Sequence, residues 1–165
     1  MPPRLTAQDI EISVAQHFNP RQNVIVPNVH WGLGLPYEAD LVVLRPSGYA
    51  IEVEIKTTVS DIRADLKKKH QHDSNLFREL WFAVPQELVA TPEIPGRAGV
   101  LGITPFDTGA HNDKWFCQVH HAAKMNRAVR PWEPRQVKKL LELGVMRIWT
   151  LKQHLAVQRL HSKKV

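Results

Sequence analysis

The sequence predicts an α/β fold, in which helices cover the faces of a central mixed β-sheet. Three observations carry this prediction: an amphipathic helical segment near the N-terminus, several apolar runs of strand length between residues 24 and 119, and helical segments rich in Leu and Val after Pro131. The chain of 165 residues is long enough to bury a sizeable core, and neither a linker nor an internal repeat divides it. We therefore expect one domain over residues 1–165.

The first helix is expected to begin at Thr6. Thr is a favoured N-cap residue, and Asp9 follows it three positions later in the manner of a capping box. The helical pattern runs to about Phe18 and stops before Pro20. A first strand is expected over Val24–Val29.

The next two apolar runs are expected to pair as an antiparallel hairpin. They are Ala39–Leu44 and Glu52–Lys56, and only the short turn Arg45–Gly48 with its flanking residues separates them. A helix capped by Ser60 is expected to follow and to continue to about His70.

Three more runs have the length and composition of strands. Leu80–Val84 is continuously apolar, which is typical of a strand buried on both faces. Gly99–Ile103 is the next strand, and Trp115–Val119 is expected at the edge of the sheet.

The C-terminal region, from about residue 131 to residue 165, is expected to be helical. Pro131 and Pro134 precede a helix that Gly144 is expected to end, and a last helix then carries Ile148, Leu151 and Leu155.

Charge divides the chain unevenly. Residues 1–113 carry 10 Lys and Arg and 14 Asp and Glu. Residues 114–165 carry 12 Lys and Arg but only 2 Asp and Glu. An acidic part beside a basic C-terminal region suits an enzyme that uses a metal on a polyanion such as nucleic acid. The alternative is a basic surface that is only solvated.

Composition also indicates where the chain works. No apolar run approaches the ~20 residues of a membrane span, and the N-terminus lacks the apolar stretch of a secretion signal. Cys117 is the only cysteine, which fits a reducing compartment. We expect a cytoplasmic protein without a membrane partner.

The metal-binding and catalytic residues are predicted to lie on the hairpin. Side chains alternate along a strand, so Glu52, Glu54 and Lys56 share one face, and Asp40 lies on the neighbouring strand. Asp40 and Glu54 would hold Mg2+ or Mn2+, and Lys56 would orient a water or stabilise developing negative charge. The alternative is a solvent-facing row of salt bridges on an edge strand.

Glu11 is a fourth candidate. Its neighbours at positions i+3, i+4 and i+7 are Val14, Ala15 and Phe18, so Glu11 projects from the face that packs on the sheet. A carboxylate there needs a cation or a donor. The alternative is a boundary Glu stabilised by the helix dipole.

Other polar residues are given lesser roles. Glu52 is expected to tune the site rather than to bind metal, and Asp61 and Asp65 are expected on the helix surface. No histidine is assigned to a metal, because His70 and His72 at i and i+2 do not face each other on a helix.

Asp40 together with Glu54-Ile-Lys56 resembles the signature of the PD-(D/E)XK nuclease superfamily, with Ala39 where that signature has Pro. Longer stretches are similar to the MmcB-type DNA repair proteins, which are bacterial members of the superfamily. These stretches are Glu38–Val43, Glu52–Lys56, Ser60–Lys67 and Leu80–Val84, and the similarity spans roughly residues 5–104.

The resemblance implies a restriction-endonuclease-like core and a role in DNA repair. It also implies that a Glu on the first helix, here Glu11, reaches the metal beside Asp40 and Glu54. It does not establish cleavage, because the superfamily includes members without proven activity.

The sequence therefore predicts metal-dependent hydrolysis of DNA phosphodiesters. A non-catalytic DNA-binding module and a protein-interaction subunit are the alternatives, and a second copy of the chain or a repair protein is left open as a partner. The basic residues expected at DNA are Lys67, Lys68, Lys69, Lys138, Lys139, Arg147 and Lys152.

Overall fold

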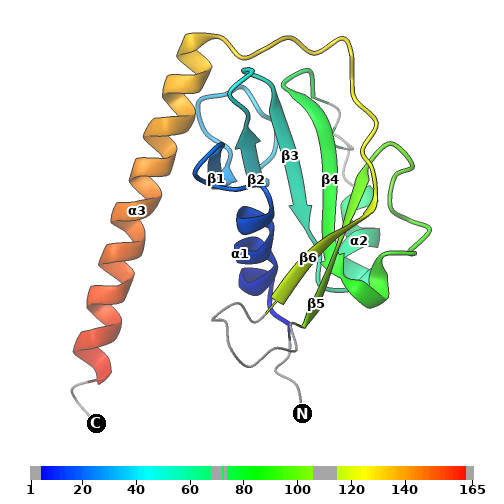
Figure 1. Cartoon of the computed structure of the whole chain (residues 1–165). Coiled ribbons are helices and arrows are strands. Elements are labelled where there is room, and N and C mark those ends of the chain that lie inside the picture. Colours follow the sequence, from blue (N-terminus) through cyan, green and yellow to red (C-terminus); the bar gives the residue numbers. More distant parts are fainter. Residues whose placement is uncertain (1–4, 68–71, 73, 106–114, 163–165) are drawn as a thin grey trace.

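A mixed sheet lies at the centre of the structure, a computed structural model that describes residues 5–67, 72, 74–105 and 115–162 (Figure 1). Within these residues the sheet has six strands, which lie side by side in chain order. The strands are β1 (Val24–Val29), β2 (Ala39–Leu44), β3 (Ala50–Ile55), β4 (Phe77–Pro85), β5 (Gly99–Pro105) and β6 (Trp115–His121).

The first three strands form an antiparallel meander, and β4 and β5 then run parallel to β3. The predicted hairpin of β2 and β3 is confirmed. Its turn closes through hydrogen bonds from Gly48 N to Arg45 O (2.9 Å) and from Arg45 N to Tyr49 O (3.0 Å). Strand β6 pairs antiparallel with β5 at the edge, as expected. The predicted α/β class with a central mixed sheet is confirmed.

Helix α1 (Ala7–His17) covers one face of the sheet. Its predicted capping box is present: the Thr6 hydroxyl accepts a hydrogen bond from Asp9 N, and the Asp9 carboxylate accepts one from Thr6 N. Ile10 and Val14 are fully buried against the side chains that β2, β3, β4 and β5 direct to this face, among them Val53.

Helix α2 (Val59–Leu66) covers the opposite face (Figure 1). Ile62 is buried there against Phe82 of β4. The expected Ser60 cap is wrong, because the Thr58 hydroxyl accepts the hydrogen bond from Asp61 N and Ser60 lies inside the first turn. The helix ends at Leu66, short of the expected end at about residue 70; residues 68–70 lie outside the described part of the chain.

After the short 3-10 helix η1 (Gln86–Leu88) and strands β5 and β6, α3 (Pro134–Ser162) runs as one helix where two were expected. Gly144 does not end it. A Cβ added at Gly144 would lie 3.2 Å from Val26 Cγ2, so glycine lets the helix approach β1 closely. Packing against β1 therefore overrides the helix-stop signal.

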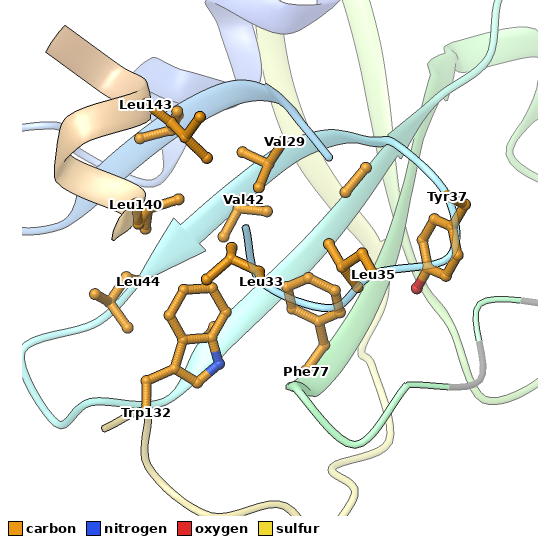
Figure 2. Close-up of a cluster of buried hydrophobic side chains, with 13 residues drawn as sticks. Val29, Leu33, Leu35, Tyr37, Val42, Leu44, Phe77, Trp132, Leu140 and Leu143 are labelled. Atoms are coloured by element: carbon orange, nitrogen blue, oxygen red, sulfur yellow. The ribbon is translucent and has the colours of Figure 1, made fainter. Parts of the chain in front are cut away.

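The first half of α3 completes a hydrophobic cluster on the α2 side of the sheet. Leu140 and Leu143 pack with Val42 and Trp132, and Tyr37 lies at the end of the cluster opposite Trp132 (Figure 2). The second half of α3 stands clear of the sheet (Figure 1).

Candidate active site

Strand β3 and the residue directly after it place a row of polar side chains in the interior. Glu52 is 0% exposed, Glu54 is 1% exposed and Lys56 is 7% exposed. Strand β3 lies between β2 and β4, away from both sheet edges. The alternative of an exposed row of salt bridges on an edge strand is therefore wrong.

The Lys56 ammonium joins the predicted residues. Its Nζ lies 2.7 Å from Glu54 Oε2 and 3.5 Å from Asp40 Oδ2. The same Asp40 oxygen accepts a hydrogen bond from Ile55 N at 2.8 Å, which fixes the carboxylate beside the end of β3. The structure thus brings Asp40, Glu54 and Lys56 together, and about a third of the Asp40 side chain faces solvent.

Glu11 lies on α1, which covers the face of the sheet opposite to α2 (Figure 1). It is half-buried, and its pKa is raised by that burial and by the charge of Asp40. The charge of Asp40 thus influences Glu11, while the role of Glu11 as a metal ligand stays a prediction.

Sequence reasoning missed His72, which lies in a turn after α2 with a φ of 54°. His72 Nδ1 is 2.9 Å from Glu52 Oε1 and 3.7 Å from Glu54 Oε1, and Nε2 hydrogen-bonds to Asp65 Oδ2. The helix-face argument against it does not apply, because His72 is not on a helix.

Asp65 and Glu52 are also more deeply involved than expected. Asp65 is buried rather than on the helix surface, and its Oδ1 lies 3.3 Å from Lys56 Nζ. The sequence contains evidence for this burial, because Asp65 lies three positions after Ile62 and residues at i and i+3 share a helix face. Glu52 accepts a hydrogen bond from the Tyr37 hydroxyl at 3.0 Å. By contrast, Asp61 is exposed and bonds to Thr57, as a helix-surface residue would.

These side chains form what we call the Lys56–His72 network. It joins four carboxylates to two cationic groups: Asp40, Glu52, Glu54 and Asp65 with Lys56 and His72. Among the described residues, Glu54 Oε1 is buried and has no hydrogen-bond partner. An excess of carboxylates, with a buried Glu54 oxygen that lacks a hydrogen bond, fits a divalent cation of the Mg2+ or Mn2+ kind, which binds oxygen donors.

Burial and mutual charge set the protonation of the network. Burial, with the charge of Asp40, raises the pKa of Glu54 to about 7 against the opposing effects of Lys56 and His72. Burial alone would lower the pKa of Lys56, but the charges of Glu54 and Asp40 outweigh it and hold the pKa above its usual value. For His72, hydrogen bonds to Asp65 and Glu52 overcome burial and raise the pKa to about 9.

A pocket of about 740 Å3 opens beside the network. Asp65 and His72 line it together with the exposed cations Arg97 and Lys124, and Arg97 Nη2 donates a hydrogen bond to the His72 carbonyl at 3.1 Å. Neither cation was expected from the sequence, where each is an isolated residue far from the hairpin.

The cations predicted to bind DNA are spread out. Lys67 is exposed at the end of α2, whereas Lys68 and Lys69 lie outside the described residues. On α3, Lys138 and Lys152 are exposed, Lys139 Nζ lies 5.0 Å from the centre of the Trp31 ring, and Arg147 donates to the Asn28 carbonyl. Lys139 and Arg147 contact residues of β1 and the loop after it, whereas Lys138 and Lys152 contact Glu142 and Trp149 of α3 itself. These contacts do not join the α3 cations to the Lys56–His72 network.

Comparisons with known proteins find a solved structure whose fold is similar to that of this chain. No protein-family profile and no curated protein matches the sequence. The chain is similar to a solved structure, the SPO1766 protein of unknown function from Silicibacter pomeroyi. That match has a TM-score of 0.64 and 22% identity over 93% of this chain and 94% of the other. Within the described residues, no helix is long and apolar enough to cross a membrane.

Proposed function

We propose that this chain is a metal-dependent nuclease of the PD-(D/E)XK superfamily that hydrolyses DNA phosphodiesters in DNA repair or a related process. The observation that carries the proposal is the convergence of Asp40, Glu54 and Lys56, with the Lys56 ammonium within 3.5 Å of both carboxylates. The element order α1–β1–β2–β3–α2–β4, with a meander followed by a parallel strand, supports a restriction-endonuclease-like core and the resemblance to MmcB-type proteins.

The carboxylates would form the cation site. Asp40 and Glu54 offer oxygens from adjacent strands, and Glu11 of α1 would add a third carboxylate. Bound Mg2+ or Mn2+ would neutralise charge on the scissile phosphate and make a bound water more acidic. The β2–β3 hairpin fixes the first two donors, because Asp40 is tied to the Ile55 amide.

Lys56 would act on the reacting oxygens. Its neighbours keep the ammonium protonated, so at neutral pH it can donate hydrogen bonds to a water or to the negative charge that develops on phosphate. Burial strengthens such a donor, because the surrounding dielectric is low. Arg97 and Lys124, beside the network, would hold neighbouring phosphates of the substrate.

A non-catalytic DNA-binding module is the second candidate. One observation favours it: the Lys56 ammonium already has three carboxylate neighbours, so the network is partly balanced without any metal. In that case the buried charges would stabilise a particular arrangement of the sheet and α2 rather than carry out chemistry.

A nuclease assay over a panel of DNA structures separates the two. Single-stranded, duplex and branched DNA would each be incubated with the protein and Mg2+ or Mn2+, with EDTA as the blank. The nuclease proposal expects cleavage of at least one structure that EDTA abolishes. Binding of DNA without cleavage of any substrate would favour the non-catalytic module.

A further inference from the structure

A second group of ligand atoms lies on the other side of Glu54 from Lys56. Glu52, Glu54 and His72 each offer one ligand atom, and these atoms all lie within 4.8 Å of one another. All three side chains are buried. Glu54 thus faces two ways, since Oε2 binds Lys56 and Oε1 faces His72.

The histidine is oriented as a metal ligand would be. Its Nε2 is bound to the buried carboxylate of Asp65, which leaves Nδ1 directed at Glu52 Oε1 (2.9 Å) and Glu54 Oε1 (3.7 Å). Histidine ligands in metalloproteins commonly donate their other ring N–H to a carboxylate, which fixes the ring and the tautomer. Asp65 is placed to do this for His72.

Two further observations point to a ligand at this position. Glu54 Oε1 is buried and lacks a hydrogen-bond partner among the described residues, which is costly unless a cation meets it. The pocket lined by Asp65, His72 and Arg97 also borders this side of the network.

We propose that Glu52, Glu54 and His72 form a second cation site, which takes a transition metal such as Mn2+, Co2+ or Zn2+ in preference to Mg2+. Imidazole nitrogen suits these metals, whereas Mg2+ prefers oxygen donors and retained waters. The site shares Glu54 with the proposed nuclease centre but does not depend on cleavage. It would fix the orientation of Glu54 from the side away from Lys56.

Pulsed EPR of the full chain with Mn2+ tests this site directly, because coupling to a 14N nucleus reports an imidazole ligand. We expect 14N coupling in the wild type, loss of that coupling in His72→Gln, and its retention in Asp40→Asn. His121→Gln, at an exposed strand position, is the matched control and should leave the spectrum unchanged. Asp65→Asn should weaken Mn2+ binding about 10- to 100-fold, as loss of a ligand's supporting carboxylate does.

If His72→Gln does not fold, the wild-type spectrum can still overturn the proposal, and Glu52→Gln offers a second variant that should lower Mn2+ affinity. Absence of 14N coupling in Mn2+-loaded wild type, its persistence in His72→Gln, or failure of the wild type to bind Mn2+ would each overturn the site. Mn2+ bound without nitrogen, and lost only in Asp40→Asn, would overturn this inference while leaving the nuclease proposal intact.

Discussion

Lys56 Nζ lies 2.7 Å from Glu54 Oε2, and Lys56 follows the last residue of β3 directly. A Lys and a Glu two positions apart on a strand commonly project together into water. Here they project into the interior between α2 and the sheet, where each needs the charge of the other. Asp40, Asp65 and His72 extend this pair into a network that reaches solvent on the Asp40 side and borders a pocket on the His72 side.

Mg2+ binding should depend on the Asp40 side of the network. Asp40→Asn and Glu54→Gln keep the side-chain shapes but remove negative charge that a hard cation needs, so Mg2+ affinity should disappear in both. Isothermal titration calorimetry measures this, with exposed Glu87→Gln of η1 as the control. Undiminished Mg2+ affinity in Asp40→Asn and Glu54→Gln would place the metal elsewhere.

The stability of the metal-free protein should fall as pH rises from about 6.5 to about 9. The pKa of His72 is raised from its ordinary 6.5 to about 9 in the folded state. The imidazolium therefore stabilises the fold fully below pH 6.5, and this contribution is lost as the pH rises through about 9. Urea unfolding in EDTA across this range checks the slope, which should be flatter in His72→Gln. Equal slopes in the two proteins would show that His72 is not held charged.

Ionisation of Glu54 should lower the stability of the metal-free protein over a lower pH range. Its folded-state pKa is raised from 4.5 to about 7, so its contribution is full below 4.5 and is lost as pH rises toward 7. Glu54→Gln cannot ionise and should remove the part of the pH dependence that lies between these values. The same urea series measures it, and an unchanged dependence in Glu54→Gln would contradict the raised pKa.

Two adjacent leucines of α3 should differ sharply in their contribution to stability. Leu140 is fully buried with Trp132, whereas Leu141 is nearly half exposed. Leu140→Ala should cost about 2–5 kcal/mol of unfolding free energy through reduced burial and a cavity, and Leu141→Ala should stay within about 0.5 kcal/mol. Denaturant unfolding measures both, and equal losses would contradict the packing of α3 on β1.

DNA binding should depend on salt and on exposed cations of α3. Lys138→Glu and Lys152→Glu should weaken binding to all sequences about equally, and should lower the salt slope by roughly one for each phosphate that the protein no longer neutralises. Fluorescence anisotropy at several salt concentrations measures this. Unchanged affinity and slope would remove α3 from the DNA interface.

The sequence was informative where local rules decide the structure. The Thr6 capping box, the turn at Gly48 and the placement of Glu54 and Lys56 on one strand face follow from short-range geometry, and all are present. The course of α3 through Gly144 could not be predicted this way, because it depends on packing against Val26 of β1.

The His72 half of the network was missed for the same reason. His72 reaches Glu52 through a turn after α2, and no local pattern pairs a turn residue with a particular strand. Asp65 could have been recognised, because it shares the inward face of Ile62. Its partner could be found only once the fold had brought the turn and β3 together.

The rate of DNA cleavage by the Lys56→Ala protein is the sharpest test of whether Lys56 and its carboxylates form an active site. Lys56 is proposed to act mainly on the transition state, so under single-turnover conditions the rate with Mg2+ should fall about 100- to 1,000-fold while DNA and Mg2+ affinities stay nearly unchanged. Exposed Arg21→Ala is the control, and circular dichroism verifies that each variant is folded. A folded Lys56→Ala protein that cleaves at the wild-type rate, or that loses only DNA affinity, would contradict the assignment of Lys56 and its carboxylates as an active site.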